Sequence, residues 1–305
     1  METRFLETFL LVVELGSIAE ASRKLNITPA AVAQRVRALE QQVGTELLTR
    51  AGHKVRATDA GNAICDQARG IVRDVRRLRA IAMSDLPSGE LRIGAVSTAI
   101  TGILPRALRA LRQENDQIDV HIHPAKSGEL YRSVQAEELD AAILVYPYFP
   151  MAKSLDWCLL RSENLVLICP EDWKHEDPDH LLATRPFIQH DRQNWGGRLA
   201  EAYLQRTGQP VNEWMELNSL EAITVMVDAG LGVSIVPRWP PPWPDGVSVA
   251  LLPLPVPFEP RHIGLIWSRA SPSQGLISIL LKHLKAASDD TPDPEVVLND
   301  RKSNS

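Results

Sequence analysis

Apolar residues in the N-terminal segment recur at the spacing of a helix face. The first set is Phe5, Phe9, Val12 and Val13. This helix should end at Gly16, and Ser17 is placed to cap a second, short helix over residues 18–25. Thr28 then caps a third helix with Pro29 at its first position, where a missing N–H costs nothing. The pattern predicts three short helices joined by tight turns.

The third helix has two sides of different composition. The side expected to be buried carries Val32, Val36, Leu39 and Val43. The other side combines small residues with long polar ones: Ala30, Ala33, Gln34, Arg37 and Gln41. Such a helix can lie close to base edges, since Gln can bridge adenine, Ala can touch a thymine methyl and Arg can reach guanine or phosphate. The alternative is an ordinary solvent-exposed face. The DNA-contact candidates here are Thr28, Pro29, Ala30, Ala33, Gln34 and Arg37.

Residues 49–56 form two short polar and basic arms around Gly52, which predicts a β-hairpin, or wing. A wing beside the third helix can touch the DNA backbone or the minor groove. Its contact candidates are Arg50, His53, Lys54 and Arg56. For His53 alone, a plain surface histidine is the competing interpretation.

A long helix should follow from a cap at Thr58 to about Met83. Its apolar stripe has near-heptad spacing: Ala60, Ile64, Ala68, Ile71, Val75 and Leu78. Dimerisation is the favoured interpretation, because helix-turn-helix proteins pair to read two half-sites. Packing against its own domain is the alternative. Pro87, Ser88 and Gly89 mark the end of this part of the chain.

Beyond Gly89, short apolar strands alternate with amphipathic helices. The strand candidates are 91–96, 120–122, 141–145, 165–169, 186–188, 233–236 and 263–267. This alternation predicts mostly parallel sheets with helices on both faces. Ligands in such folds bind at the carboxyl ends of the strands, in a crevice.

Polar residues follow several of these strands. Ser97 and Thr98 precede a helix expected near Gly102, and Ser127 repeats the arrangement, so hydroxyls and helix N–H groups could hold an anion. Further along the chain, four more candidates occupy equivalent places: His190, Arg192, Asn218 and Ser219. Simple helix capping is the alternative for each pair. We expect a small organic anion, with Arg192 or His190 as its countercharge and Tyr146 closing one wall.

The charge distribution supports a nucleic-acid partner at one end. The chain has 33 Lys and Arg, 38 Asp and Glu and a net charge of −5. Residues 1–85 hold 13 of the basic and 10 of the acidic residues, which leaves 20 and 28 for the remainder. Clustered basic residues on an acidic protein favour binding to phosphates through counterion release.

Composition excludes several other classes of protein. The three cysteines form no C-x-x-C pair, and the apolar run 9–13 is too short for a membrane span or signal peptide. A reduced, cytoplasmic protein without a membrane partner fits. His190 and Asp191 with Ser219 superficially resemble a nucleophile system, but no catalytic motif, metal spacing or phosphate loop accompanies them. We therefore expect no catalytic residue, metal or cofactor, and an enzyme fused to a helix-turn-helix remains the weaker alternative.

Two segments are unusual. Residues 237–244 contain five prolines and can be neither helix nor central strand, so a rigid surface loop is expected, with docking to an aromatic groove on a partner as the alternative. Residues 289–305 are polar and predict a disordered tail.

One family matches this arrangement of residues. The matching N-terminal positions are Phe9, Val12, Glu14, Gly16, Ser17, Ala21, Leu25, Ile27, Thr28, Ala31, Val32, Arg37, Leu39, Glu40, Gly44, Leu47, Leu48, Arg50, Thr58, Ala60 and Gly61. In order and spacing they resemble the LysR-type transcriptional regulators. Residues 139–143 and 229–237 also look like landmarks of the LysR effector domain.

The resemblance implies a winged helix-turn-helix at 1–58, a linker and dimerisation helix with hinge at 59–88, and an α/β effector domain at 89–288. That domain should have two lobes hinged by crossing strands, as in periplasmic solute-binding proteins, with lobe I at 89–161 and 267–288 and lobe II at 162–266. The implied partners are double-stranded operator DNA, a small effector in the interlobe cleft, further copies of the chain as a dimer and then a tetramer, and RNA polymerase.

The chain also departs from the family. Its reading helix begins Thr28, Pro29, Ala30, Ala31 where the family often has Ser, Gln, Pro, Ala, so the target sequence is not transferable. His53 stands where the wing usually has Arg. A redox-sensing variant using Cys158 and Cys169 is the remaining alternative, although both lie on or beside expected core strands, where an inert thiol is the default.

Overall fold

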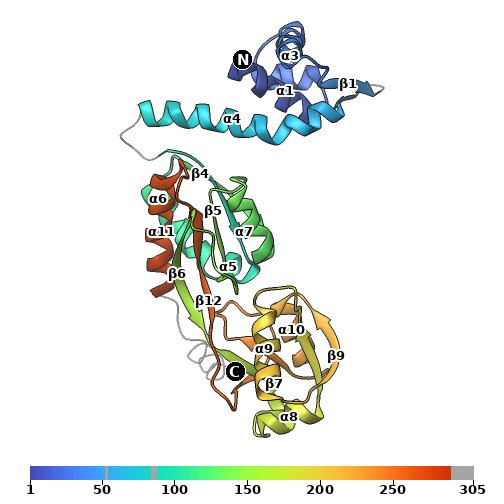
Figure 1. Ribbon diagram of the computed structural model, residues 1–305, viewed down its shortest axis with the longest axis vertical. Coiled ribbons are helices and arrows are strands. Elements are labelled where there is room, and N and C mark those ends of the chain that lie inside the picture. The colour runs from blue at the N-terminus through green and yellow to red at the C-terminus, as the bar shows by residue number, and fades with distance from the viewer. Residues whose placement is uncertain (52–53, 84–87, 290–305) are drawn as a thin grey trace. The chain divides into compact units, whose positions relative to one another are not determined.

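The computed structural model describes residues 1–51, 54–83 and 88–289 (Figure 1). His53, residues 84–87 of the expected hinge and residues 290–305 of the expected tail lie outside the described residues. The chain divides into two units, one ending at Gly89 and one beginning at Glu90.

The first unit begins with helices α1 (Thr3–Leu15), α2 (Ile18–Leu25) and α3 (Pro29–Val43). Their ends follow the expected local signals. Gly16 ends α1 in the left-handed conformation, the Ser17 hydroxyl accepts from the N–H of Glu20, and the Thr28 hydroxyl accepts from the N–H of Ala31 at 3.2 Å. The apolar faces of the three helices meet in a fully buried core that includes Phe9, Val12, Ala21, Val32 and Leu39.

One expected core residue of α3 is not buried. Val43 is 40% exposed, because α3 ends there and Gly44 turns the chain away with φ 85°. Glu40 has a role that its charge did not indicate: its Oε1 accepts from the backbone N–H groups of Leu47 at 2.8 Å and Leu48 at 3.1 Å. This carboxylate fixes the chain at the start of the wing.

The wing consists of antiparallel strands β1 (Leu48–Ala51) and β2 (Lys54–Ala57). It is anchored to the helices, since the N–H of Val55 donates to the carbonyl of Gly16 at 2.9 Å. A β-carbon at Gly61, in the helix after the wing, would lie 2.2 Å from the carbonyl oxygen of Leu47, so only glycine fits there.

Helix α4 (Asp59–Met83) starts at the expected cap, where the Thr58 hydroxyl accepts from the N–H of Gly61 at 3.0 Å. Its first half packs on the same unit: Cys65, Ala68 and Val72 are buried in one cluster with Phe9. Leu78, further along, is 66% exposed. The helix therefore divides its apolar stripe between its own unit and an uncovered part.

The second unit has two lobes. The sheet of lobe I has the order β4-β3-β5-β12-β6. Its strands are β3 (Gly89–Ala95), β4 (Ile118–Pro124), β5 (Ala141–Val145), β6 (Leu155–Glu163) and β12 (Arg261–Ser268). Its helices are α5 (Ser97–Thr101), α6 (Ile103–Glu114), α7 (Ser127–Gln135) and α11 (Gln274–Asp289). In Figure 1, α6 and α11 lie on one face of the sheet and α7 on the other.

Lobe II is built around β7 (Leu165–Pro170), which pairs antiparallel with β10 (Ser234–Pro237) and β11 (Val249–Pro253). The neighbouring β8 (Pro186–His190) and β9 (Asn212–Leu217) are parallel to each other. All six residues of β7 are buried, because α8 (Pro178–Thr184) and α9 (Gly197–Thr207) cover one face and α10 (Leu220–Asp228) covers the other.

The sheets differ from the sequence-based expectation. They are mixed: β3 and β5 are parallel, but β12 runs antiparallel to both β5 and β6. Strands β6, β9 and β11 were not expected from the sequence. The second crossing between the lobes also comes before Arg261, not at 266–267, because β12 belongs to the lobe I sheet over its whole length.

The proline-rich segment 237–244 packs against the protein itself. Trp239 is 1% exposed in the lobe II core and stacks on Trp243, with ring centroids 4.5 Å apart. A β-carbon at Gly102 would lie 3.8 Å from Pro240. These contacts favour the rigid-loop interpretation over docking to a partner.

Candidate nucleic-acid interface and effector site

The α3 face that the sequence singled out is accessible. Thr28, Pro29, Ala30, Gln34 and Arg37 are exposed, and Ala33 is half-buried. Val32, Val36 and Leu39 anchor the opposite face in the core, so the exposed side chains are carried by a rigid helix. Within the described residues, no ion pair is present that would occupy the guanidinium of Arg37. The helix presents a small first turn and then two long polar groups, as major-groove readout requires.

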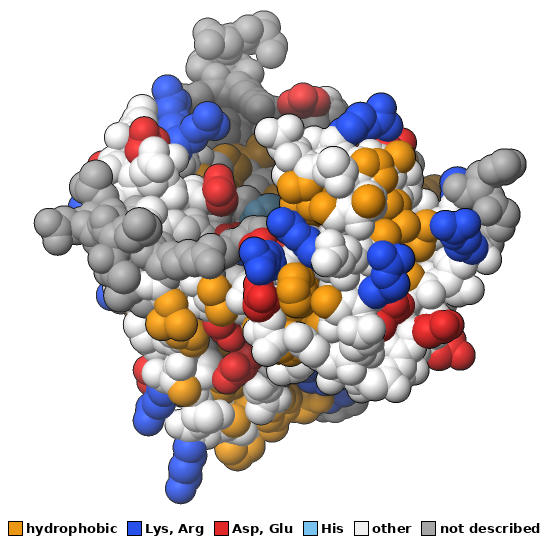
Figure 2. Space-filling model, turned by 90° about the horizontal axis from the view of Figure 1, so that it is seen from above, with side chains coloured by type: hydrophobic (Ala, Val, Ile, Leu, Met, Phe, Trp, Pro, Cys, Tyr) orange, Lys and Arg blue, Asp and Glu red, His pale blue; other side chains and the backbone are white. Residues whose placement is uncertain are grey.

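The wing adds three exposed cations. Strand register places Lys54 and Arg56 on one face, and Arg50 opposite Val55 on the other. On the face of the molecule drawn in Figure 2, basic side chains are scattered among acidic and apolar ones.

The effector-site candidates of lobe I lie at the expected strand ends but in different surroundings. Ser97 is exposed, whereas Thr98 and Ser127 are buried. The Ser127 hydroxyl accepts from the N–H of Val145 at 3.2 Å, which leaves its O–H free to donate to another group. Thr98 faces a charged partner that the sequence-based reasoning missed.

That partner is Arg261, the first residue of β12, which is 3% exposed. Its Nε donates to Glu163 Oε2 at 2.7 Å, and its Nη2 approaches the Thr98 hydroxyl at 3.4 Å. The ion pair joins the end of β6 to the start of β12, the two places where the chain leaves lobe I for lobe II and returns from it. A charged residue just before the apolar run 263–267 was the available signal, since buried arginines are rare unless paired.

His190, at the end of β8, lies beside Arg261. A β-carbon at Gly196 would lie 3.5 Å from both His190 Cε1 and Arg261 Cδ. Burial, reinforced by the nearby Arg261, lowers the pKa of His190 to about 4, so the imidazole is neutral at pH 7. Its Nε2 lies 3.4 Å from the amide of Asn194, while its buried Nδ1 has no hydrogen-bond partner among the residues that the structure describes.

A second contact joins the lobes at the residues next to Ser127 and His190. Lys126 Nζ donates to Asp191 Oδ2 at 2.6 Å. Burial opposes ionisation of Asp191, but the hydrogen bonds from Lys126 and from the N–H of Gln193, together with the charge of Lys126, outweigh it and lower the pKa of this carboxyl. Thr98 of lobe I and His190 of lobe II thus lie beside Arg261, and Ser127 is next to Lys126 of the interlobe ion pair.

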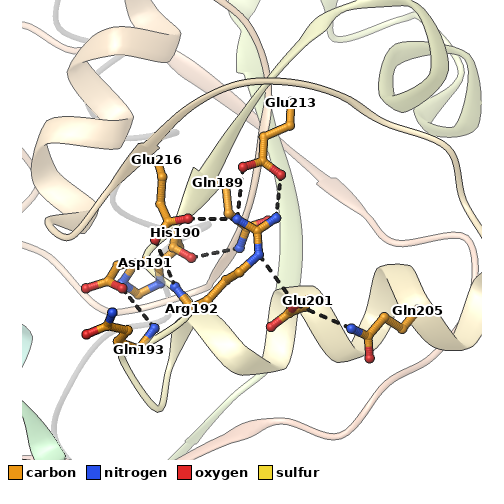
Figure 3. A network of polar contacts seen from close by, with 9 residues as sticks. All are labelled: Gln189, His190, Asp191, Arg192, Gln193, Glu201, Gln205, Glu213 and Glu216. Carbon is orange, nitrogen blue, oxygen red and sulfur yellow. Dashed lines mark hydrogen bonds and ion pairs between the residues drawn. The ribbon is translucent and has the colours of Figure 1, made fainter.

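Arg192 has a different environment from the one expected. Figure 3 shows its guanidinium among three carboxylates, those of Glu201, Glu213 and Glu216. Its Nη1 donates to Glu213 at 2.9 Å and to Glu216 at 2.7 Å, and its Nε lies 3.4 Å from Glu201. These hydrogen bonds, first that of Glu213, raise the pKa of Arg192. Its charge is already balanced by neighbours on its own lobe.

The remaining candidates are not brought into this group by the contacts of the structure. The Ser219 hydroxyl caps α10 by accepting from the N–H of Ala222 at 3.2 Å, and Asn218 is exposed. Tyr146 is half-exposed and packs edge-on against Trp157 of lobe I.

The cysteines have the environment of structural thiols. Cys169 is fully buried in β7, and burial raises its pKa to about 11. Cys158 is half-buried on β6, and all three cysteines are free. A thiol that stays protonated is a poor nucleophile toward peroxide, so the environment of Cys169 gives the redox interpretation no support.

The fold and these two sites define an effector-responsive, DNA-binding transcription regulator. The family described as "LysR substrate binding domain" matches residues 84–289, and "Bacterial regulatory helix-turn-helix protein, lysR family" matches residues 3–62. The chain belongs to the LysR family of transcription regulators. Membership confirms the expected regulator with an effector domain in preference to an enzyme.

Relatives extend over nearly the whole chain. The "DNA-binding transcriptional dual regulator OxyR" of Escherichia coli K12 is 26% identical over 296 residues, 95% of this chain and 96% of the relative. OxyR of Corynebacterium glutamicum, solved as a C206 mutant, has a TM-score of 0.65 at 21% identity, covering 99% of this chain and 96% of that one. Full-length CbnR, solved in complex with its target DNA, also has a TM-score of 0.65 at 21% identity and covers 94% and 100%. The two structures share the fold of this chain.

Proposed function

We propose that this regulator takes a small organic anion between the lobes of its effector domain and that the anion changes its binding to operator DNA. The observation that carries the proposal is the unpartnered, buried Nδ1 of His190 beside the guanidinium of Arg261. Because Nε2 faces the Asn194 amide as an acceptor, the neutral imidazole carries its proton on Nδ1 and offers a donor. A buried donor without a partner is costly, and an oxygen of a bound acid would satisfy it.

Charge and hydrogen bonding at this place favour an acid over a neutral ligand. The donors that we assign to the site are His190 Nδ1, the hydroxyls of Thr98 and Ser127, and the guanidinium of Arg261. Arg261 is balanced by Glu163 and Lys126 by Asp191, so the anion would bind by exchanging or sharing these pairs. The remaining candidates are assigned only to the outer part of the proposed site, beyond these donors: Ser97, Tyr146, Arg192, Asn218 and Ser219.

The DNA-facing half of the proposal uses α3 and the wing. Ala30, Ala33, Gln34 and Arg37 would lie in the major groove, and Arg50, His53, Lys54 and Arg56 would contact the backbone or minor groove. The exposed end of α4 around Leu78 supports pairing of two copies, and a tetramer and contact with RNA polymerase are further parts of the proposal. Among the described helices there is none with the length and apolarity of a membrane span. A cytoplasmic location is the one in which such a regulator would meet its DNA.

The effector proposal can be tested by thermal shift of the full chain at pH 7.5. The probes are acetate, benzoate, succinate and 2-oxoglutarate, with benzamide and succinamide as uncharged counterparts. At least one acid should raise the Tm while its amide does not. His190→Phe, which lacks a donor, should weaken the response about tenfold or more, and His190→Gln, which keeps one, should weaken it less.

The Asp177→Ala variant is the matched control, since Asp177 caps α8 by accepting from the N–H of His180 at 3.0 Å and is not one of the proposed effector residues. It should lower the Tm slightly and leave the acid response intact. A Tm that responds to none of the acids, or equally to acid and amide, contradicts the proposal.

A further inference from the structure

A tryptophan of lobe II is buried in lobe I. Trp195 stands between β8 and α9, both elements of lobe II, yet it is 8% exposed and belongs to the same buried cluster as Leu130 and Tyr131 of α7. A ring of this size contributes strongly to any contact surface it fills. The burial of Trp195 therefore depends on the lobes being together.

Three aromatic rings of lobe I surround this side chain. The centroid of Trp195 lies 5.4 Å from Phe149, 5.8 Å from Tyr131 and 6.0 Å from Tyr148, with edge-on or tilted geometry in each case. Tyr131 is itself fixed, because its hydroxyl accepts from the N–H of Ala152 at 3.0 Å. The indole thus packs against a set of aromatic rings that belong to lobe I.

The backbone of α7 leaves room for the indole. A β-carbon at Gly128 would lie 3.4 Å from Trp195 Nε1, within van der Waals contact, so the indole packs on the first turn of α7. Gly128 follows Ser127, and Trp195 lies four residues after Asp191, so the ring contact adjoins the Lys126–Asp191 ion pair. At the start of α9, the guanidinium of Arg198 lies 4.3 Å from the ring centroid of Tyr148, which gives a third tie between the lobes.

We propose that Trp195, with Arg198, is an interlobe latch that holds the two lobes closed beside the effector site. The hinge strands connect the lobes covalently and permit rotation, whereas the latch contacts exist only in the closed arrangement. Release of Trp195 would separate His190 and Asp191 from Ser127 and Lys126. Only this last consequence, that the effector site comes apart when the latch opens, rests on the proposed function.

The test is hydrogen–deuterium exchange of the full chain, without ligand, in two latch segments, 126–135 and 189–198. Trp195→Ala removes three ring contacts and should raise exchange there by roughly 10- to 100-fold. Segments 103–114 of lobe I and 178–184 of lobe II lie on other elements and should stay within about twofold. The control Trp214→Ala removes a tryptophan that is 55% exposed on β9 and should change neither latch segment.

Two milder variants keep the test decisive if Trp195→Ala does not fold. Tyr148→Ala and Arg198→Ala each remove a surface partner from a different lobe and should raise latch exchange by a few-fold. An equal rise of exchange in all segments would show that Trp195 is a general core residue and would overturn the latch. Unchanged exchange at 126–135 and 189–198 would overturn it as well. This experiment adds no acid, so its outcome does not depend on whether an effector has been found.

Discussion

The buried imidazole of His190 makes the stability of the effector domain depend on pH. Its pKa is about 4 in the folded protein, below its ordinary value of 6.5, because burial and Arg261 disfavour the charged form. Between these two values the unfolded chain binds a proton that the folded chain does not. The free energy of unfolding is therefore highest above pH 6.5 and falls as the pH is lowered toward 4.

The size of the effect follows from the same shift. At pH 5, which is about 1.5 units below the unfolded pKa, His190 should cost roughly 2 kcal/mol of stability relative to pH 7, at 1.36 kcal/mol per unit. A His190→Gln side chain does not titrate and keeps a hydrogen-bond donor. The other groups titrate in both proteins, so the difference between them isolates His190.

Urea unfolding followed by tryptophan fluorescence is suited to this comparison, because all seven tryptophans lie between Trp157 and Trp267 and report only the second unit. From pH 7 to pH 5, wild type should lose about 2 kcal/mol more than His190→Gln. Parallel losses in the two proteins would refute the claim that His190 is held neutral by its surroundings. A larger loss in the variant would reverse the sign and contradict the linkage.

Three further predictions address other parts of the chain. Gly61→Ala should lower the stability of the DNA-binding unit by about 1–3 kcal/mol in thermal unfolding followed by circular dichroism, because the clash exceeds the ~1 kcal/mol gain in helix propensity. The control is Gly275→Ala, which has open space around it and should be neutral or stabilising. Equal effects of the two substitutions would contradict the packing argument. Changing Cys158 and Cys169 to Ser should leave DNA binding unresponsive to peroxide, as in wild type, and a peroxide response that only wild type shows in an anisotropy titration would establish a redox role. Leu78→Glu should weaken self-association about tenfold or more in sedimentation velocity, whereas an unchanged association would separate α4 from the dimer contact.

The helix-turn-helix could be predicted from sequence because its signals are local. The second and third helices each start at a capping hydroxyl, that of Ser17 and that of Thr28, and the core stripe of α3 follows from spacing alone. Val43 was misplaced because its burial depends on where the chain turns at Gly44, not on its place in the stripe. The role of Glu40 depends on backbone groups seven and eight residues away, which no periodicity reveals.

The effector domain was harder to predict because its contacts are distant in sequence. Strand candidates could be located, but the antiparallel pairing of β12 with β6 joins segments about a hundred residues apart. The same applies to charges. Arg192 was a reasonable countercharge by position, yet the carboxylates of Glu213 and Glu216 occupy it, while the buried Arg261 comes from the far end of the domain. Helical or strand spacing cannot show which acidic side chain pairs with which basic one.

The claim that α3 reads DNA through its Ala, Gln and Arg face is tested most directly by selecting duplexes from a random pool with the full-length protein. Fluorescence anisotropy then compares the selected duplex with a scrambled one for wild type and for Gln34→Ala, at fixed salt. Wild type should prefer the selected duplex by at least about a thousandfold, and Gln34→Ala should lose about 1–3 kcal/mol of that preference while binding scrambled DNA equally well. A selected sequence that Gln34→Ala discriminates as well as wild type does would contradict the assignment of α3 as the reading helix.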